Sequence, residues 1–366
     1  MRIAILGIRG IPATYGGFET CAEELATRLA QRGHEVTVYC RSGHYSDRIS
    51  SYEGVRLVYR PALKAKAAET LSHTLFSIFS GVRHADAILI FNVANSPCAW
   101  IAELLGKPCA LNLDGMEWKR RKWGALGRTY FRFAAFLAAR YCKWLIADSH
   151  SIMEYYGKRY GACPEFIAYG ARVEASQDPG VLEKFGLKTG GYILSVSRLE
   201  PENNADLTLR AFEGLQSDIN LVIVGGASYK SGYARELFRT RDRRVKFLGP
   251  IYDKKTLREI WCNSALYVHG NEVGGTNPAL LQALGYGNCV LALNVPFNAE
   301  VVGDAAILYE KDEYDLRKKM ELLLGNPELV KSLRKRAVEQ ITLTYDWEKV
   351  TDAYERLFRK MLGKKN

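Results

Sequence analysis

The sequence lacks the features that mark secreted, membrane-spanning and metal-dependent proteins. Its eight cysteines stand singly, with no Cys-x-x-Cys pair, and no secretory signal precedes the first apolar segment, so we expect reduced thiols in a cytoplasmic protein. The longest apolar stretch, residues 131–147, is interrupted by Arg132, Arg140 and Lys143, which argues against a bilayer-crossing helix of about 18 apolar residues. The six histidines lack ligand spacing with neighbouring Cys or Asp, so we expect no metal site.

The length of the chain indicates its number of domains, and its net charge indicates the kind of partner that it binds. With 366 residues and 48% hydrophobic content, the chain is too long for one ordinary core and suits two domains. The net charge of +11 indicates a polyanionic partner, which is nucleic acid, an anionic membrane surface or a phosphorylated substrate. Charge alone does not choose among them.

Strand and helix patterns alternate along both halves of the chain, which predicts parallel sheets. Met1–Gly7 is a continuous apolar run, and a glycine-rich turn, a helix over 19–32 and a strand over 35–40 follow it. The later strands are expected at 55–60, 87–91, 108–113, 145–148, 192–196, 220–224, 245–248, 265–269, 290–293 and 306–308. In the first half, further helices are expected at 71–82, 129–143 and 151–160.

The periodicity fades near residues 174–190 and restarts at Tyr192, which indicates a linker. We therefore predict an N-terminal domain over 1–175 and a C-terminal domain over 190–345. The tail, 346–366, is a helix with one apolar face. It either crosses back to the first domain or packs on the second.

Two glycine-rich turns are candidate phosphate sites. The first places Gly10, Gly16 and Gly17 between a strand and a helix, where backbone N–H groups can approach an anion; the alternative is a turn that glycine merely tightens. The second has Gly274 and Gly275 before Thr276-Asn-Pro278. Asn is a strong N-cap and Pro is preferred as the first helical residue, so we expect a helix to begin at Pro278.

Two more residues, Arg198 and His269, are expected near the edge of the second sheet that carries the second turn. Arg198 ends the first strand of the second domain, where it would neutralise a diphosphate unless it pairs with Glu200 or Glu202. His269 ends a strand just before the second turn, and either bonds a sugar or is structural.

Two carboxylates, Asp114 and Glu117, follow the 108–113 strand. They are candidates for acid/base chemistry or for orienting an acceptor, and Asp114 is preferred; the alternative is an Asp that caps the turn. The run Trp118-Lys-Arg-Arg-Lys-Trp123, with Trp118 and Lys119 on the acceptor side, suits an anionic membrane next to a lipid-linked acceptor. The alternatives are nucleic acid, which we do not expect, and a solvated charge run whose tryptophans pack inward.

At these motifs the chain resembles the family 4 retaining glycosyltransferases of the GT-B fold, and more closely the bacterial branch that contains rhamnosyltransferases of cell-surface polysaccharide synthesis. The resemblance covers nearly the whole chain. The segments that carry it are residues 9–19, 112–123, 169–171, 198–204, 269–270, 273–278 and 345–348.

The resemblance implies an α/β chain with two Rossmann-like, doubly wound domains facing a cleft, and metal-independent transfer from a nucleotide diphosphate sugar, dTDP- or UDP-linked. It also implies that Gly16 and Gly17 touch the diphosphate, that Arg198 binds it, and that the backbone of Val273–Asn277 holds sugar and phosphate. The expected acceptor is a glycan or a polyprenyl-pyrophosphate-linked glycan. Rhamnose or another hexose is the expected sugar.

The chain departs from the family pattern at two positions. Asn203 replaces a basic residue, for which Arg9 or Lys230 would substitute. Gln282 replaces the glutamate that holds the donor ribose, and the family's earlier glutamate position falls on Gly274, with Glu272 nearby. These departures keep two other functions open, a sugar-nucleotide epimerase or hydrolase and a non-catalytic sugar-nucleotide-binding protein.

Overall fold

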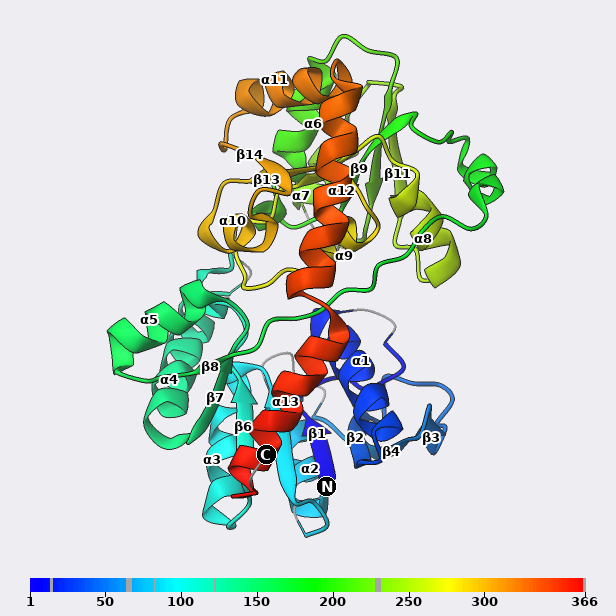
Figure 1. Cartoon of the computed structure of the whole chain (residues 1–366). Coiled ribbons are helices and arrows are strands. Elements are labelled where there is room, and N and C mark those ends of the chain that lie inside the picture. The colour runs from blue at the N-terminus through cyan, green and yellow to red at the C-terminus, as the bar shows by residue number, and fades with distance from the viewer. Residues whose placement is uncertain (14–15, 64–67, 82, 122, 228–231, 365–366) are drawn as a thin grey trace. The chain divides into compact units, whose positions relative to one another are not determined.

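The computed structural model describes residues 1–13, 16–63, 68–81, 83–121, 123–227 and 232–364. The chain divides into two compact units (Figure 1). Unit 1 comprises Met1–Tyr169 with Trp347–Asn366, and unit 2 comprises Gly170–Asp346. Each unit is described by itself.

In the described residues of unit 1, eight strands form one sheet in the order β3-β4-β2-β1-β5-β6-β7-β8. All neighbours are parallel except β3 and β4. The strands are β1 (Arg2–Leu6), β2 (Glu35–Arg41), β3 (Ser51–Tyr52), β4 (Val55–Arg60), β5 (Ala87–Phe91), β6 (Cys109–Asn112), β7 (Trp144–Ala147) and β8 (Glu165–Phe166).

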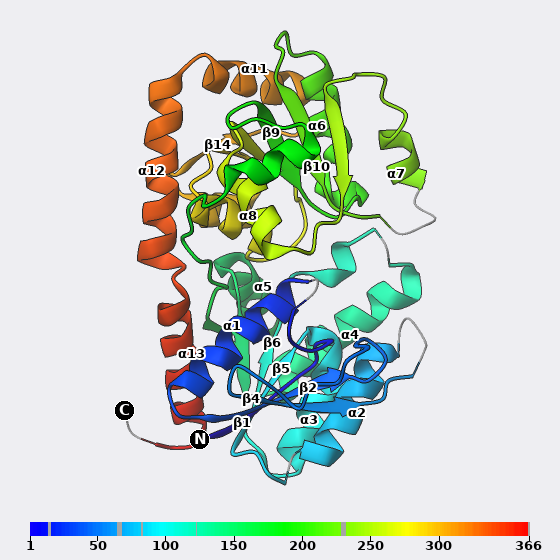
Figure 2. The ribbon, with the colours of Figure 1, turned by 90° about the vertical axis from the view of Figure 1, so that its right-hand side faces the viewer.

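Helices cover both faces of this sheet (Figure 2). The core on one face joins even-numbered residues of β1, such as Ala4 and Leu6, to side chains of α2, α3, α4 and α5. The other face carries α1 and α13, which pack against each other. The helices are α1 (Gly17–Gln31), α2 (Glu69–Gly81), α3 (Ser96–Leu104), α4 (Ala125–Tyr141), α5 (His150–Tyr160) and α13 (Trp347–Met361).

The tail helix α13 therefore belongs to unit 1 although it follows unit 2 in sequence. Its apolar face is buried, with Tyr354 and Phe358 fully covered. Arg32, the C-cap residue of α1, adds ion pairs to Glu348 at 2.6 Å and to Asp352 at 2.6 Å. Because these charged groups are partly exposed, the apolar burial contributes most of the attachment.

In the described residues of unit 2, six parallel strands form a sheet in the order β11-β10-β9-β12-β13-β14. This is the order of a doubly wound nucleotide-binding sheet, in which the chain starts at the centre and winds outward in both directions. The strands are β9 (Tyr192–Val196), β10 (Asn220–Val224), β11 (Val245–Gly249), β12 (Leu266–His269), β13 (Val290–Leu293) and β14 (Ala306–Tyr309).

Helices surround the second sheet as well. Buried side chains of α6, α7 and α11 join one face of the sheet in a single core, and α9 packs against α10 and α12. The helices are α6 (Ala205–Glu213), α7 (Gly232–Leu237), α8 (Lys254–Cys262), α9 (Pro278–Gly285), α10 (Pro296–Val302), α11 (Glu313–Leu324) and α12 (Pro327–Thr344).

The predicted α/β fold class with two parallel-sheet domains is confirmed. The chain passes between the units after Tyr169 and after Asp346, and the N–H of Ala171 donates to the carbonyl of Tyr345 at 2.9 Å. The segment expected to be a linker contains a 3₁₀ helix, Pro179–Phe185, which packs on α8.

Several elements of unit 1 differ from the sequence-based expectation, and the two-residue strands β3 and β8 were not expected. Helix α3 was not expected, because its nine residues present too short an apolar pattern. Helix α4 begins at Ala125 rather than at residue 129, since Gly124 ends the preceding loop. Across the described residues, no helix combines the length and apolarity needed to span a bilayer.

Candidate functional site

The winding of the unit 2 sheet reverses between β9 and β12, which are neighbours. The loops that leave their carboxyl ends are residues 197–204, which lead to α6, and residues 270–277, which lead to α9. Open α/β sheets bind ligands at such a switch point, because the diverging loops leave room between them. The second glycine turn and the Arg198 segment therefore meet at one place in unit 2.

Buried hydrogen bonds hold the two loops together. The side-chain amide of Asn204 donates to the carbonyl of Gly270 at 2.8 Å, and the N–H of Glu272 donates to the carbonyl of Glu202 at 3.0 Å. A Cβ at position 270 would lie 2.5 Å from the carbonyl oxygen of Asn203. Glycine is required at 270 because the two backbones approach so closely.

The second glycine turn leads into α9 as the sequence predicts. Helix α9 begins at Pro278, and the side chain of Asn277 caps it by accepting from the N–H of Ala279 at 3.0 Å. The first N–H groups of α9 are thus already hydrogen-bonded to Asn277, those of Leu280 and Leu281 through its backbone carbonyl. In the described part of the chain, the backbone N–H groups of Gly274, Gly275 and Asn277 donate no hydrogen bond, so the turn offers donors to an anion next to the positive end of α9.

Arg198 lies at the carboxyl end of β9 and is half-buried. Its carbonyl accepts from the side-chain amide of Asn203 at 2.7 Å and from the N–H of Glu200 at 2.8 Å. Its guanidinium forms no ion pair with any residue that the structure describes, so the expected alternative of pairing with Glu200 or Glu202 does not occur. The positive charge remains available to a ligand.

Asn203 and Glu202 have roles that the sequence did not reveal. Asn203 is buried, and its side-chain amide donates a hydrogen bond to the backbone carbonyl of Arg198. Glu202 is 1% exposed, and its two carboxylate oxygens have no hydrogen-bond partner in the described residues. Burying a carboxylate without a hydrogen-bond partner costs free energy. A bound hydroxyl, water molecule or cation at Glu202 would therefore stabilise this loop.

His269 ends β12 directly beneath the Gly270 turn. Its Nδ1 lies 3.0 Å from the hydroxyl of Tyr267, and its Nε2 has no partner in the described residues. Burial lowers the pKa of His269 to about 3, because the interior disfavours the charged imidazolium. The ring is therefore neutral near pH 7 and serves as a hydrogen-bonding group.

The remaining predicted donor residues surround this turn. Glu272 forms an ion pair with Lys311, a residue that the sequence analysis did not single out. Thr276 is buried, whereas Val273 and Gln282 are half-buried, and Gln282 lies one turn into α9. Lys230, expected as a substitute cation, lies outside the described residues.

The first glycine turn, in unit 1, is occupied by carboxylates of its own helix. Oε1 of Glu19 accepts from the N–H of Arg9 at 3.0 Å, and Glu23 accepts from the N–H of Ala13. A Cβ at Gly16 would lie 2.1 Å from Oε2 of Glu19. An anion bound at Gly16 and Gly17 would face this negative charge, so the first turn is a weaker anion site than the second.

Asp114 follows β6 and has a positive φ of 55°. Its N–H donates to the side-chain carbonyl of Asn112 at 3.1 Å, and the amide of Asn112 donates to the hydroxyl of Tyr354 at 3.2 Å. A non-glycine residue in the left-handed region is uncommon and is held there by its surroundings. The backbone of Asp114 is therefore held in place at the carboxyl edge of the unit 1 sheet, and its side chain there is half-buried.

Trp118 and Trp123 pack inward, which corrects the expectation of tryptophans facing a membrane and agrees with the alternative in which they pack on the core. Trp118 is 7% exposed and packs on Tyr155, with ring centroids 5.4 Å apart. Trp123 packs on Phe131 and donates from Nε1 to Glu117 at 3.0 Å. The physical reason is that the buried Glu117 pairs with Arg120 and accepts the Nε1 hydrogen bond of Trp123, which holds the loop against unit 1. Lys119 alone of the predicted acceptor-side residues is exposed.

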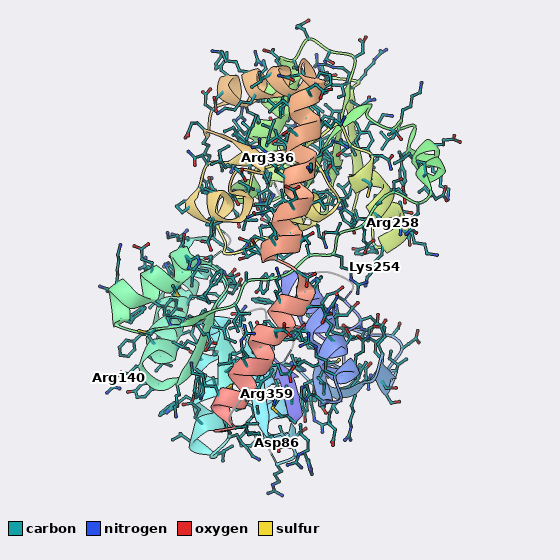
Figure 3. The ribbon with its side chains drawn as sticks, viewed as in Figure 1. Asp86, Arg140, Lys254, Arg258, Arg336 and Arg359 are labelled. Atoms are coloured by element: carbon teal, nitrogen blue, oxygen red, sulfur yellow. The ribbon has the colours of Figure 1, made fainter. Side chains whose placement is uncertain are left out.

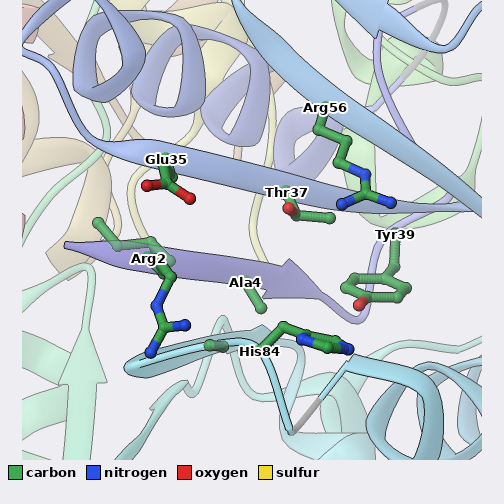
Figure 4. A pocket seen from close by; sticks show the side chains of 9 residues that line it. Arg2, Ala4, Glu35, Thr37, Tyr39, Arg56 and His84 are labelled. Atoms are coloured by element: carbon green, nitrogen blue, oxygen red, sulfur yellow. The ribbon is translucent and has the colours of Figure 1, made fainter.

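A cavity of about 210 Å³ lies at the opposite, amino-terminal end of the unit 1 strands (Figure 4). Arg2, Glu35, Arg56 and His84 line it, and it is remote from the carboxyl ends of β1 and β6. None of the predicted site residues lines it. In the residues described, no group of three His, Cys, Asp or Glu side chains is placed to hold a metal ion.

Two family models match successive parts of the chain. Residues 182–340 match the model of the glycosyl transferases group 1 family. Residues 1–172 match a domain of unknown function, DUF1972. The O-antigen chain mannosyltransferase B of Escherichia coli is 26% identical over 141 residues, which span 37% of this chain and 37% of that protein.

Solved structures resemble nearly the whole chain. Sucrose-phosphate synthase from Thermosynechococcus elongatus matches with a TM-score of 0.82 at 16% identity, covering 99% of both chains. HepE from Anabaena, solved with UDP and glucose, matches with a TM-score of 0.76 at 17% identity over 98% of this chain and 99% of that one. WaaG, a glycosyltransferase of lipopolysaccharide biosynthesis, matches with a TM-score of 0.73 at 16% identity over 99% and 100%. These similarities establish the GT-B fold.

Proposed function

We propose, from the membership of residues 182–340 in the glycosyl transferases group 1 family, that this chain is a glycosyltransferase of surface polysaccharide synthesis. The observation that carries the proposal is the junction of two loops at the switch point of unit 2. There the Arg198 guanidinium and the N–H groups of Gly274 and Gly275 have no protein partner in the described residues. Both are groups that bind diphosphates.

The donor in this proposal is a nucleotide diphosphate sugar. The complex of HepE with UDP and glucose supports a UDP-linked donor, and a dTDP-linked donor is the alternative. Arg198 would bind the diphosphate, and the backbone of Val273–Asn277 would hold the phosphate and the sugar. Neutral His269 and the carboxylate of Glu202 are available to sugar or ribose hydroxyls, together with Gln282.

We propose retention of the anomeric configuration without a metal ion. Arg198 and the turn N–H groups would stabilise the negative charge that develops on the leaving diphosphate. The donor phosphate would then accept the proton of the attacking hydroxyl, with Asp114 orienting the acceptor. The favoured sugars are rhamnose and other hexoses, and the similarity to a mannosyltransferase adds mannose to those that need testing.

The proposed acceptor is a glycan or a polyprenyl-pyrophosphate-linked glycan, and the enzyme would act in the cytoplasm at the inner face of the membrane. Thermal-shift screening of UDP-, dTDP- and GDP-linked sugars identifies the donor, since at equal concentration the ligand that binds the folded chain most tightly stabilises it most. Product analysis with donor alone and with added acceptor follows. Sugar transfer to acceptor supports the proposal; conversion of donor alone indicates an epimerase or hydrolase, and tight binding without turnover indicates a binding protein.

A further inference from the structure

The outer faces of α2, α3 and α4 in unit 1 expose an unusual number of large apolar side chains. Helix α3 packs against both α2 and α4, so the three helices form one layer (Figure 2). The exposed residues on this layer, with their exposed fractions, are Phe76 (41%), Phe79 (65%), Trp100 (38%), Leu104 (68%), Leu126 (90%), Phe133 (53%), Phe136 (47%) and Tyr141 (43%). Single exposed apolar residues are ordinary, but a group on adjacent helices marks an interaction surface.

Helix α4 contributes the central part of this surface. Its inner face buries Phe131, Ala134 and Ala138 in the core. Residues 126, 129, 132, 133, 136 and 140 all point outward, as the helical spacing of i, i+3, i+4 and i+7 requires. One exposed stripe therefore carries the apolar Leu126, Phe133 and Phe136 together with the basic Arg132 and Arg140.

The charge on the α4 stripe is entirely positive. The helix contains Arg128, Arg132 and Arg140 and no Asp or Glu. In the described residues these three arginines form no ion pair, and Arg140 extends away from the body of unit 1 (Figure 3). The Arg140 guanidinium lies 5.6 Å from the ring of Tyr141, which in turn packs on Trp100 of α3.

The geometry points to this layer, which we call the α2–α4 surface, as a docking surface for an anionic lipid bilayer. Phe, Trp and Leu side chains enter the interfacial region while arginines on the same face contact anionic headgroups, the arrangement of a helix that lies in the plane of a membrane. A second copy of the chain is disfavoured, because two such faces would bring like charges together. Leu104 and Leu126 also offer nothing to the bases or phosphates of a nucleic acid, whereas a bilayer accepts them.

This inference rests on the proposed function and deepens it, because it identifies the surface of the chain that contacts the membrane in which a lipid-linked acceptor lies. It also replaces the Trp118–Trp123 run, whose tryptophans pack inward, with a different set of residues. The test does not depend on turnover, so the failure of either proposal is visible separately.

The experiment is co-sedimentation of the full chain with phosphatidylglycerol/phosphatidylcholine vesicles and with phosphatidylcholine vesicles alone, without donor or acceptor. The surface variants are Phe133→Ser with Phe136→Ser, and Arg132→Gln with Arg140→Gln. The matched controls in unit 2 are Leu322→Ser with Leu343→Ser, at residues 51% and 70% exposed, and Arg239→Gln with Lys335→Gln, at side chains 76% and 80% exposed.

We expect binding to the anionic vesicles that weakens with salt, and a loss on the order of tenfold in each surface variant. The controls should bind as the unmodified chain does, and all variants should keep the same thermal shift with the donor. The inference is overturned if the unmodified chain does not bind anionic vesicles at low salt, or if the controls lose as much binding as the surface variants. Binding to single-stranded DNA in preference to vesicles, or dimerisation abolished by the Phe variants, would also overturn it.

Discussion

The side-chain amide of Asn204 reaches the carbonyl of Gly270 at 2.8 Å and ties together the two loops of the unit 2 switch point. Both partners are constrained. Asn204 has a positive φ of 52°, and Gly270 has no room for a Cβ. The position of Arg198 relative to the Gly274–Gly275 turn depends on this junction.

Replacing Asn204 tests the junction directly. Asn204→Ala should lower the free energy of unfolding by about 1–3 kcal/mol, because the buried Gly270 carbonyl loses a hydrogen bond, and should weaken donor binding. Asn204→Gly is the matched variant, since glycine accepts the positive φ without strain. If donor affinity, measured by calorimetry, falls in the Ala variant but not in the Gly variant, strain at position 204 matters and the hydrogen bond does not.

Two glycine substitutions separate folding from binding. Gly270→Ala places a Cβ 2.5 Å from the backbone of Asn203, whereas Gly274→Ala meets nothing within 4 Å. We expect Gly270→Ala to cost about 1–3 kcal/mol in stability and Gly274→Ala to leave the melting temperature nearly unchanged. A binding role for the turn predicts that Gly274→Ala still weakens donor affinity; an affinity equal to that of the unmodified chain argues against that role.

Buried His269 predicts how stability depends on pH. Burial lowers its pKa to about 3, while the unfolded chain titrates near 6.5. Between these values the unfolded state binds more protons, so the free energy of unfolding falls as pH decreases from 6.5 towards 3. His269→Gln should flatten this dependence by up to about 1.4 kcal/mol per pH unit. Denaturant titrations at pH 6.5, 5.5 and 4.5 measure it, and equal slopes in both proteins contradict the assignment.

Glu117 distinguishes a structural carboxylate from an acceptor-binding one. Glu117→Ala should destabilise the chain by about 3–5 kcal/mol, because it removes the buried carboxylate that pairs with Arg120 and accepts from Nε1 of Trp123. Glu117→Gln keeps an acceptor for Trp123 and should cost less. A Glu117→Gln variant of native stability that loses all transfer activity would show that the carboxylate contacts substrate.

Much of the fold was predictable because its signals are local. Glycine after β1, the apolar strands and the Asn277-Pro278 cap each depend on neighbouring residues alone, and the structure places them as expected. The sheet order was not predictable in detail, and it is the order that brings Arg198 and Gly274 to one switch point.

Several site contacts depend on distant residues and left no sequence signal. Lys311 pairs with Glu272, which lies 39 residues away in the sequence. In the sequence Asn203 only replaces an expected basic residue, and its hydrogen bond to the Arg198 carbonyl is visible only in the structure. The inward packing of Trp118 similarly depends on Tyr155, a residue of α5. The sequence of residues 118–123 alone therefore predicts an exposed segment, because the contacts of its tryptophans involve residues that are distant in the sequence.

The central claim is that Arg198 and the Gly274–Gly275 turn bind the diphosphate of a nucleotide sugar for transfer. Its most direct test is transfer of labelled sugar to acceptor by the unmodified chain and by Arg198→Ala, with calorimetric binding of the nucleoside diphosphate measured in parallel. The claim predicts that Arg198→Ala folds normally, binds the diphosphate at least about tenfold more weakly and loses most transfer. Equal diphosphate binding and equal transfer in the two proteins would contradict it.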